Sequence, residues 1–405
     1  MTSIRFNHFC RAFVLLAALL EFSANAELSF IFTNTAPAAI PRRASIIFIQ
    51  CDGLGYGDLS CYGQTKYQTP NLDKLAAEGI RFTNYFAGAA ASSPARAVLM
   101  LGKDASRLVQ NTDVDVPLAA DDITVAQVLK QAGYHTGLIG EWNLGDENSH
   151  GAPWRKGFDE FAGYLNPADA ENYYADYIFR YAPKSIINET NNQLEDYLGR
   201  EPLIDNAGGA KGKYIPDVLT KAAMNFVVNN QPDKFNRFRP FFLQVDYATP
   251  RANSAEAERT GNGMQVPTDA PFSDEPWPQP EKNRAAMVAR LDGDLGKLME
   301  QLGKIGMTNN VALFFSSVTT AKRAGGVGPE FFHSNISTND LRVPMIVHWP
   351  GKIPAGQVSG YKWSPRDFLP TAAQIGFANS PTNLDGVSIL PVLTGRMRTN
   401  APAKN

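Results

Sequence analysis

The chain is organised around residues 91–102, which read Ala91-Ser92-Ser93-Pro94-Ala95-Arg96-Ala97-Val98-Leu99-Met100-Leu101-Gly102. Proline is favoured in the first turn of a helix because it has no N–H to leave unpaired, and a serine before it can accept from the free N–H groups. We therefore predict a helix with Ser93 as its N-cap and Ser92 at its mouth. Helix dipoles favour an anion there, and we expect Arg96, one turn further on, to point back toward Ser92. An ordinary capped helix also explains these residues.

Ser92-x-Pro94-x-Arg96 resembles the signature of the sulfatase family. In this family a Cys, or in some bacterial members a Ser, is oxidised to formylglycine, the aldehyde whose hydrate attacks sulfate esters. Other segments that resemble the family's motifs follow in its order: Ile46-Ile47-Phe48-Ile49-Gln50-Cys51-Asp52-Gly53-Leu54-Gly55-Tyr56-Gly57-Asp58, Thr69-Pro70-Asn71-Leu72-Asp73, Gly79-Ile80-Arg81-Phe82, Gly133-Tyr134-His135-Thr136-Gly137-Leu138-Ile139-Gly140-Glu141-Trp142-Asn143-Leu144-Gly145, Gly157-Phe158-Asp159, Arg342-Val343-Pro344 and Asp385-Gly386-Val387-Ser388. The resemblance spans residues 45–395. It implies an α/β fold of the alkaline-phosphatase and sulfatase type, with a large mixed, mainly parallel sheet between helical layers.

The hydrophobic periodicity alternates in type from Ala44 onward. Apolar runs suited to strands buried on both faces are 46–50, 138–140, 241–247, 311–315 and 345–348. Amphipathic helical segments are 72–78, 124–131, 214–229, 283–305 and 368–375. The alternation predicts a mainly parallel sheet covered on both sides, with residues 46–50 on an interior strand and functional residues at the carboxyl ends of strands. Four polar residues lie at or just after such ends: Asp52, Glu141, Asp246 and Ser317.

Composition bounds the class of protein. The 405 residues are 44% hydrophobic and 19% charged, which is enough for a full-sized α/β core. The formal net charge of −2 leaves no basic stripe, so nucleic acid is not an expected partner. Two cysteines, Cys51 and Cys61, follow residue 26, and we predict that both are free packed thiols.

Residues 1–26 resemble a secretory signal peptide. Arg5 and Arg11 precede the apolar run 12–20, and Ala24-Asn25-Ala26 supplies small residues for cleavage. The run is too short to span a bilayer, although an uncleaved anchor is the alternative. We therefore expect a secreted or periplasmic protein with no membrane segment after cleavage: a signal peptide at 1–26, a linker at 27–44, the sulfatase-like domain at 45–395 and a tail at 396–405.

Two segments of weak periodicity, 166–213 and 249–281, interrupt the alternation of strands and helices. Insertions of this kind usually line the mouth of a site and set substrate choice. At the other end of the domain, only residues 396–405 follow Gly395, where the family continues into a small antiparallel subdomain. We expect that subdomain to be missing, which leaves either an exposed sheet edge or a fragment.

The resemblance also implies a calcium site. In the family, two adjacent Asp residues, an Asp-Asn pair and the formylglycine oxygen hold the ion. Here Asp52 is kept, but Gly53 matches the second Asp, and Ser317 and Val318 match the Asp-Asn pair. Calcium takes six to eight oxygen ligands and is held largely by carboxylate charge. We therefore expect Asp52 and Ser317 to bind calcium weakly or not at all.

The family's substrate-binding cations are also replaced. Glu141 and Asn143 match a Lys and a His, Arg251 matches another His, and His333 matches a further Lys. In the family these residues hold sulfate oxygens and protonate the leaving group. A carboxylate at Glu141 would repel a sulfate ester.

The remaining charges balance without a metal. Asp52 and Glu141 stand against Arg96 and Arg251, and a buried carboxylate left without a cation would be costly. We therefore predict ion pairs that join Asp52 to Arg96 and Glu141 to Arg251.

Two functions stay open. The first is an exported, non-catalytic sulfatase relative that binds a sulfated or other anionic glycan, or a partner protein, in the old cleft. The second is a serine-type sulfatase with formylglycine at Ser92, in which Ser92 and Arg96 act on sulfate esters of sugars or aryl compounds. Without oxidation Ser92 is a weak nucleophile, because it has neither a metal nor an adjacent His base.

Overall fold

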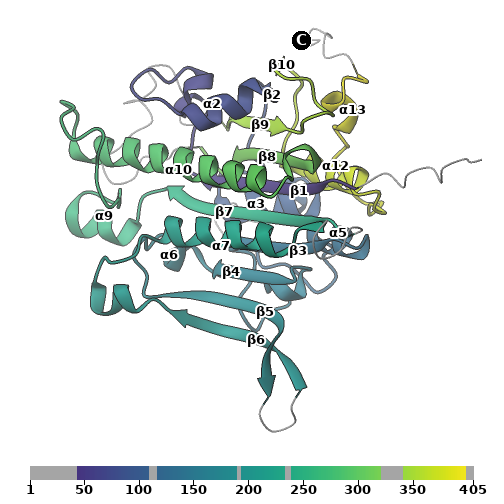
Figure 1. The fold of residues 1–405 in the computed structure, drawn as a ribbon, viewed down its shortest axis with the longest axis horizontal. Helices are drawn as coiled ribbons and strands as arrows, with labels where there is room; N and C mark the ends of the chain where they lie inside the picture. Colours follow the sequence, from purple (N-terminus) through teal and green to yellow (C-terminus); the bar gives the residue numbers. More distant parts are fainter. Residues whose placement is uncertain (1–42, 109–115, 189–192, 233–238, 321–340, 398–405) are drawn as a thin grey trace, which may run out of the picture. The chain divides into compact units, whose positions relative to one another are not determined.

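The computed structural model describes residues 43–108, 116–188, 193–232, 239–320 and 341–397. Within these ranges a ten-stranded sheet has the order β10-β2-β9-β8-β1-β7-β3-β4-β5-β6 (Figure 1). The strands are β1 (Ser45–Asp52), β2 (Ile80–Phe82), β3 (His135–Glu141), β4 (Glu160–Tyr164), β5 (Tyr177–Asn188), β6 (Gln193–Pro202), β7 (Phe241–Pro250), β8 (Val311–Ser317), β9 (Met345–His348) and β10 (Gln357–Ser359).

Strand β1 lies in the interior of the sheet, as predicted. It pairs in parallel with β7 on one side and β8 on the other, and all eight of its residues are buried. Strands β3 and β4 continue the parallel part, whereas β9, β5 and β6 pair antiparallel to their neighbours. The expectation of a mixed, mainly parallel sheet is therefore confirmed.

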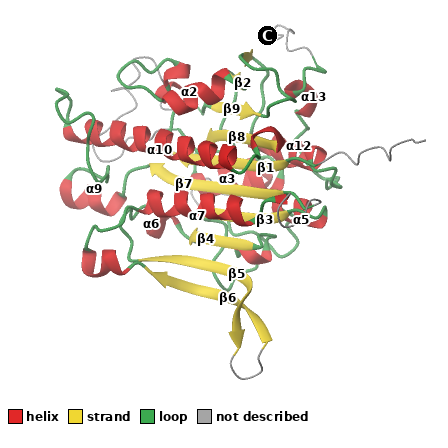
Figure 2. Ribbon diagram, viewed as in Figure 1, coloured by secondary structure: helices red, strands yellow, loops and turns green. Residues whose placement is uncertain are grey.

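Helices cover both faces of the sheet, and Figure 2 shows α7 and α10 in front of the strands. The helices are α2 (Pro70–Ala77), α3 (Ser92–Leu101), α4 (Ala105–Leu108), α5 (Val125–Gln131), α6 (Pro167–Ala170), α7 (Ile215–Asn229), α9 (Ser254–Thr260), α10 (Gln279–Lys304), α12 (Phe368–Ile375) and α13 (Leu390–Leu393). Ile47 and Ile49 of β1 pack with α2, α7 and α10, whereas Ile46 and Phe48 pack with α3, α5 and α12. This alternation buries both faces of β1, which is why its sequence is continuously apolar.

The start of α3 differs from the prediction. Its N-cap is Ala91, so Ser92 and Ser93 are the first two residues of the helix and neither serine caps it. Ser93 Oγ instead accepts a hydrogen bond from the N–H of Val116 at 2.8 Å. The prediction of Ser93 as N-cap was wrong because the hydroxyls of both serines form hydrogen bonds with residues distant in the sequence, Asp52 and Val116.

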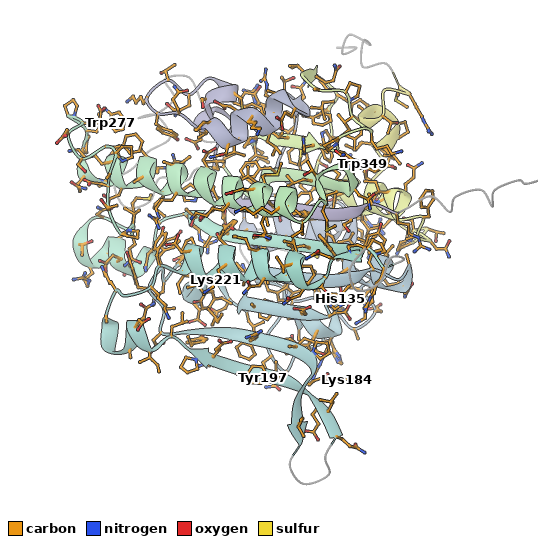
Figure 3. All side chains as sticks on the ribbon, in the orientation of Figure 1. His135, Lys184, Tyr197, Lys221, Trp277 and Trp349 are labelled. Atoms are coloured by element: carbon orange, nitrogen blue, oxygen red, sulfur yellow. The ribbon has the colours of Figure 1, made fainter. Side chains whose placement is uncertain are left out.

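The segment 166–213 contains a hairpin that the sequence did not predict. Strands β5 and β6 form it, and Figure 3 labels Lys184 and Tyr197 on it. Most residues of β6 are exposed, so its sequence lacks the apolar alternation that marks a half-buried strand. Where β5 pairs with β4, its residues Phe179 and Tyr181 pack against Trp154, and this contact holds that part of the hairpin in place.

Two further findings bear on the sequence predictions. Cys51 is buried in β1, Cys61 is half-buried, and both are free thiols as predicted. None of the helices in the described ranges combines the length and the apolar character needed to cross a bilayer.

Candidate active site

Three parallel strands bring carboxylates to one edge of the sheet. Asp52 and Glu141 are the last residues of β1 and β3, and Asp246 lies in β7 beside both strands. Parallel strands end at the same edge, so the three side chains share one neighbourhood, and helix α3 places Ser92 and Arg96 against it. His135, at the amino end of β3, lies at the opposite edge of the sheet (Figure 3).

Ser92 is bound to Asp52. Its hydroxyl donates to Asp52 Oδ2 at 2.7 Å, and Arg96 Nη2 lies 4.0 Å from the same oxygen. The other carboxylate oxygen, Oδ1, accepts from Thr319 Oγ1 at 2.6 Å. Ser92 and Arg96 therefore face a common group, as expected from residues four apart on a helix.

Arg96 is almost fully buried and spans β3 and β7. Its Nη1 lies 2.7 Å from Asp246 Oδ2 and donates to the main-chain oxygen of Glu141 at 3.0 Å. Its Nη2 lies 3.0 Å from Glu141 Oε2. The predicted pairing of Arg96 with Asp52 is therefore a long contact, and Asp246 and Glu141 are its close partners.

Arg251 follows β7 and binds three carboxylates. Its Nη1 is bonded to Asp52 Oδ2, its Nη2 lies 2.9 Å from Glu141 Oε2, and its Nε lies 3.2 Å from Glu171 Oε1. Its main-chain oxygen accepts from the hydroxyl of Tyr173 at 2.6 Å. The predicted pair between Glu141 and Arg251 is present, and Arg251 is also the main cationic partner of Asp52.

We call these six ionisable side chains the site cluster: Asp52, Arg96, Glu141, Glu171, Asp246 and Arg251. It holds four carboxylates and two guanidinium groups. Ser92 beside it is half-buried, whereas the side chains of Asp52, Arg96, Glu141 and Asp246 are at most 1% exposed.

Burial and charge shift the pKa values in opposite directions. Burial raises the pKa of Asp246 to about 7, although Arg96 and Gln244 partly oppose the shift. Burial alone would also raise the pKa of Asp52, but Arg251, Arg96 and the bound hydroxyls hold it below its usual value. Glu141 and Asp52 hold the pKa of Arg251 above its usual value despite burial.

Comparison with known proteins identifies the fold that carries this cluster. The family model for Sulfatase matches residues 44–376. The chain is 31% identical to human arylsulfatase A over 391 residues, covering 91% of this chain and 71% of that protein. It belongs to the sulfatase family.

Solved structures that are similar to this chain agree with this fold. The crystal structure of Ps i-CgsB in complex with k-i-k-neocarrahexaose is 27% identical with a TM-score of 0.68, and the match covers 88% of this chain and 77% of that one. The structure of BT4656 in complex with its substrate D-glucosamine-2-N,6-O-disulfate is 22% identical with a TM-score of 0.64, covering 89% and 82%, which supports the fold alone.

The residues at the family's calcium position do not fit that ion. Both oxygens of Asp52 already accept from side chains, and the Arg251 guanidinium lies against one of them. Ser317 Oγ lies 2.7 Å from the main-chain oxygen of Thr319 and accepts from the N–H of Leu54 at 3.2 Å, so it is turned into the main chain. No group of three or more His, Cys, Asp or Glu side chains in the described part of the chain is placed to hold a metal. The carboxylates gathered here are bound by guanidinium groups in a salt-bridge network, so they are not arranged as the oxygen ligands that calcium requires.

Two other predicted positions are not members of the site cluster. Asn143 follows β3 with a positive φ of 55°, and its N–H donates to Leu165 O at 3.1 Å. His333 lies outside the described residues. A small cavity with room for about one water molecule lies beside Glu141 and Asp246, and its lining includes Tyr164, Tyr173 and Tyr247.

Sequence reasoning missed two members of the site cluster and one neighbour. Asp246 was marked as a strand-end residue but not as an ion-pair partner, although an aspartate inside an otherwise apolar strand was a usable signal. Glu171 and Thr319 gave no such signal, because each lies in a connecting segment whose path the periodicity does not define.

Proposed function

We propose that this protein is an exported member of the sulfatase family whose site does not hydrolyse sulfate esters. The observation that carries the proposal is the excess of carboxylates in the site cluster. In the part of the chain that the structure describes, the guanidinium groups of Arg96 and Arg251 are bound by carboxylates, so neither is available to hold a sulfate group.

Electrostatics oppose the substrate directly. A sulfate ester carries a negative charge, and two like charges about 4 Å apart repel by about 4 kcal/mol at an effective dielectric constant of about 20. Glu141 occupies the position of a lysine in the family. Its carboxylate neutralises the charge of Arg96 and Arg251 instead of adding a positive charge to the site. A site with this balance stabilises neither the bound ester nor the charge that develops on the leaving oxygen.

The same electrostatic argument applies to Ser92 and to calcium. We propose that Ser92 remains a hydroxyl whose role is to bind Asp52, and that calcium is not held at Asp52 and Ser317. Residues 1–26 act as a signal peptide in this proposal, with a linker at 27–44 and a single sulfatase-like domain at 45–395. The partner class that we propose is a sulfated or other anionic glycan, because a similar solved structure contains neocarrahexaose; since the site cluster repels anions, we expect the charged groups of the glycan to be held outside that cluster.

One observation favours the alternative of a serine-type sulfatase. Ser92, Pro94 and Arg96 keep the family's order in the first turns of α3, and Ser92 is partly open to solvent. In this alternative Ser92 is oxidised to formylglycine, Arg96 supports it, and Asn143, Arg251 and His333 contact the substrate.

Mass spectrometry and an activity assay on one sample separate the two functions. The full chain is purified from its native host, the Ser92 peptide is weighed, calcium is measured, and hydrolysis of 4-nitrophenyl sulfate is compared with that of Ser92→Ala. We expect an unmodified serine, no stoichiometric calcium and no hydrolysis above the variant. A Ser92 peptide lighter by two hydrogen atoms, with hydrolysis that disappears in Ser92→Ala, would establish the alternative.

A further inference from the structure

Arg251 joins three separate parts of the chain. Its guanidinium contacts Asp52 at the end of β1, Glu141 at the end of β3 and Glu171 just after α6. A guanidinium is planar and presents N–H donors in a rigid fork, so a single side chain can satisfy several carboxylates at once. The side chain of Arg251 is itself only 16% exposed.

No other cation in the site cluster can take over this role. Arg96 is committed to Asp246 and Glu141, and its distance to Asp52 is 4.0 Å. Without Arg251, Asp52 would keep its hydroxyl partners but, among the described residues, no cation closer than Arg96 at 4.0 Å, and Glu171 would lose its cation and keep the N–H of Ser254. Removal of one partner from a buried ion pair is strongly destabilising, because the remaining charge is left uncompensated.

The same contacts explain why calcium does not fit. A metal ion that approached Asp52 and Glu141 would have to displace Nη1 and Nη2 of Arg251 from their carboxylate oxygens. We propose that the Arg251 guanidinium is the resident cation of this site, joining the ends of β1 and β3 to the Glu171 segment in place of a metal ion. The inference concerns what holds the site together, and it stands whether or not Ser92 hydrolyses a sulfate ester.

Thermal unfolding of the full chain tests it by chemical rescue. The wild-type melting temperature should be the same in EDTA and in millimolar calcium chloride. Arg251→Ala should lower it by about 5 °C or more, and millimolar methylguanidinium should restore at least half of that loss by entering the vacated position. Sodium chloride of equal ionic strength should not restore it. Arg180→Ala is the matched control, because its pair with Glu201 is exposed, and neither the substitution nor methylguanidinium should shift its melting temperature noticeably.

A second variant keeps the test decisive if Arg251→Ala does not fold. Arg251→Met combined with Glu141→Gln removes one carboxylate together with the cation, so the double variant should be more stable than Arg251→Met alone. A double variant no more stable than the single one, or no rescue by methylguanidinium, would overturn the inference. A calcium-dependent rise in the wild-type melting temperature would overturn it as well, even if the protein proved inactive; calcium-independent hydrolysis would instead remove the proposed function and leave this inference intact.

Discussion

Two buried arginine clusters lie beside the carboxyl end of β1, and they differ in charge balance. In the first, Arg284 from α10 forms a two-pronged pair with Asp58, with N···O distances of 3.0 and 2.8 Å, and also donates to the main-chain oxygen of Gly53. The second is the site cluster, in which two guanidinium groups meet four carboxylates. A balanced pair fixes the loop after β1. In the site cluster, burial, together with the nearby charges of Glu141 and Asp52, raises the pKa of Asp246 to about 7, so this cluster is sensitive to changes in charge.

The comparison assigns the two clusters different roles. Side chains of Arg284 and Asp58 are 4% and 1% exposed, so the pair is closed to solvent on both sides. Arg251 and Glu171 are 16% and 18% exposed, which makes them the accessible side of the site cluster. Perturbed and unbalanced ionisable groups that reach solvent are typical of sites that bind or once bound a ligand.

The largest loss of stability should follow a substitution in the Arg284–Asp58 pair. Arg284→Met should lower the free energy of unfolding by about 3–5 kcal/mol, because the buried carboxylate of Asp58 then loses the guanidinium that binds both of its oxygens. Chemical denaturation measures the loss. The matched control is Arg284→Met with Asp58→Asn, which should recover much of it; equal stability of the single and double variants would show that packing, and not charge, dominates this pair.

The second prediction concerns the pH dependence that Asp246 imposes. Its pKa is about 7 in the folded protein and 3.8 in the reference state, so the folded state binds the proton more tightly. The resulting stabilisation is complete below about pH 4 and is lost as the pH rises to about 7, by a few kcal/mol. Asp246→Asn should remove this loss, and denaturation of both proteins from pH 4 to pH 8 measures it.

Gln244 supplies the control for that experiment. Its side-chain amide donates to Asp246 Oδ2 at 2.8 Å without carrying a charge. Gln244→Met should therefore lower stability and raise the pKa of Asp246 further, so the loss of stability with rising pH should persist and move to higher pH. An Asp246→Asn protein that loses stability over the same pH range as the wild type would assign the titration to another group.

A smaller loss of stability should distinguish the site cluster from the Arg284–Asp58 pair. Glu141→Gln leaves three carboxylates against two guanidinium groups, so it should cost only about 1–2 kcal/mol despite complete burial. Asp58→Asn, which removes the carboxylate charge that faces the buried Arg284 guanidinium, should cost several times more. Equal losses in urea denaturation of the two variants would contradict the role that we assign to the excess carboxylates.

The sequence predicts the frame of the molecule better than its site. The strand at 46–50 and the helix at 368–375 were predicted because apolar residues recur with the period that each buried element requires. The hairpin β5–β6 was missed because exposed strands do not need that pattern.

Within the site, residues next to predicted elements were found and those in connections were not. Glu141 and Arg251 were paired correctly because the family's motifs place both residues in one site, where their charges balance. Glu171 and Thr319 reach the site cluster through segments whose path depends on tertiary packing, and no local pattern in the sequence encodes that path. Ser93 was taken as an N-cap because local rules cannot register the competing N–H of Val116.

The smallest predicted effect belongs to the residue around which the family's chemistry is organised. Ser92 donates one hydrogen bond to Asp52, and that carboxylate keeps Arg251 and Thr319 as partners when the hydroxyl is removed. Ser92→Ala should therefore cost only about 1 kcal/mol, below the roughly 1.5–3 kcal/mol usual for a hydrogen bond to a charged group, because Arg251 and Thr319 keep the carboxylate paired. Thr319→Val is the matched control, since Thr319 also donates one hydroxyl to the same carboxylate, and it should cost a similar amount. A Ser92→Ala protein that is much less stable than Thr319→Val would mean that Ser92 supports the cluster beyond a single hydrogen bond. A Ser92→Ala protein that loses sulfatase activity would instead make Ser92 the nucleophile of an enzyme, and the acid excess around it would then have to be overcome by the oxidised residue.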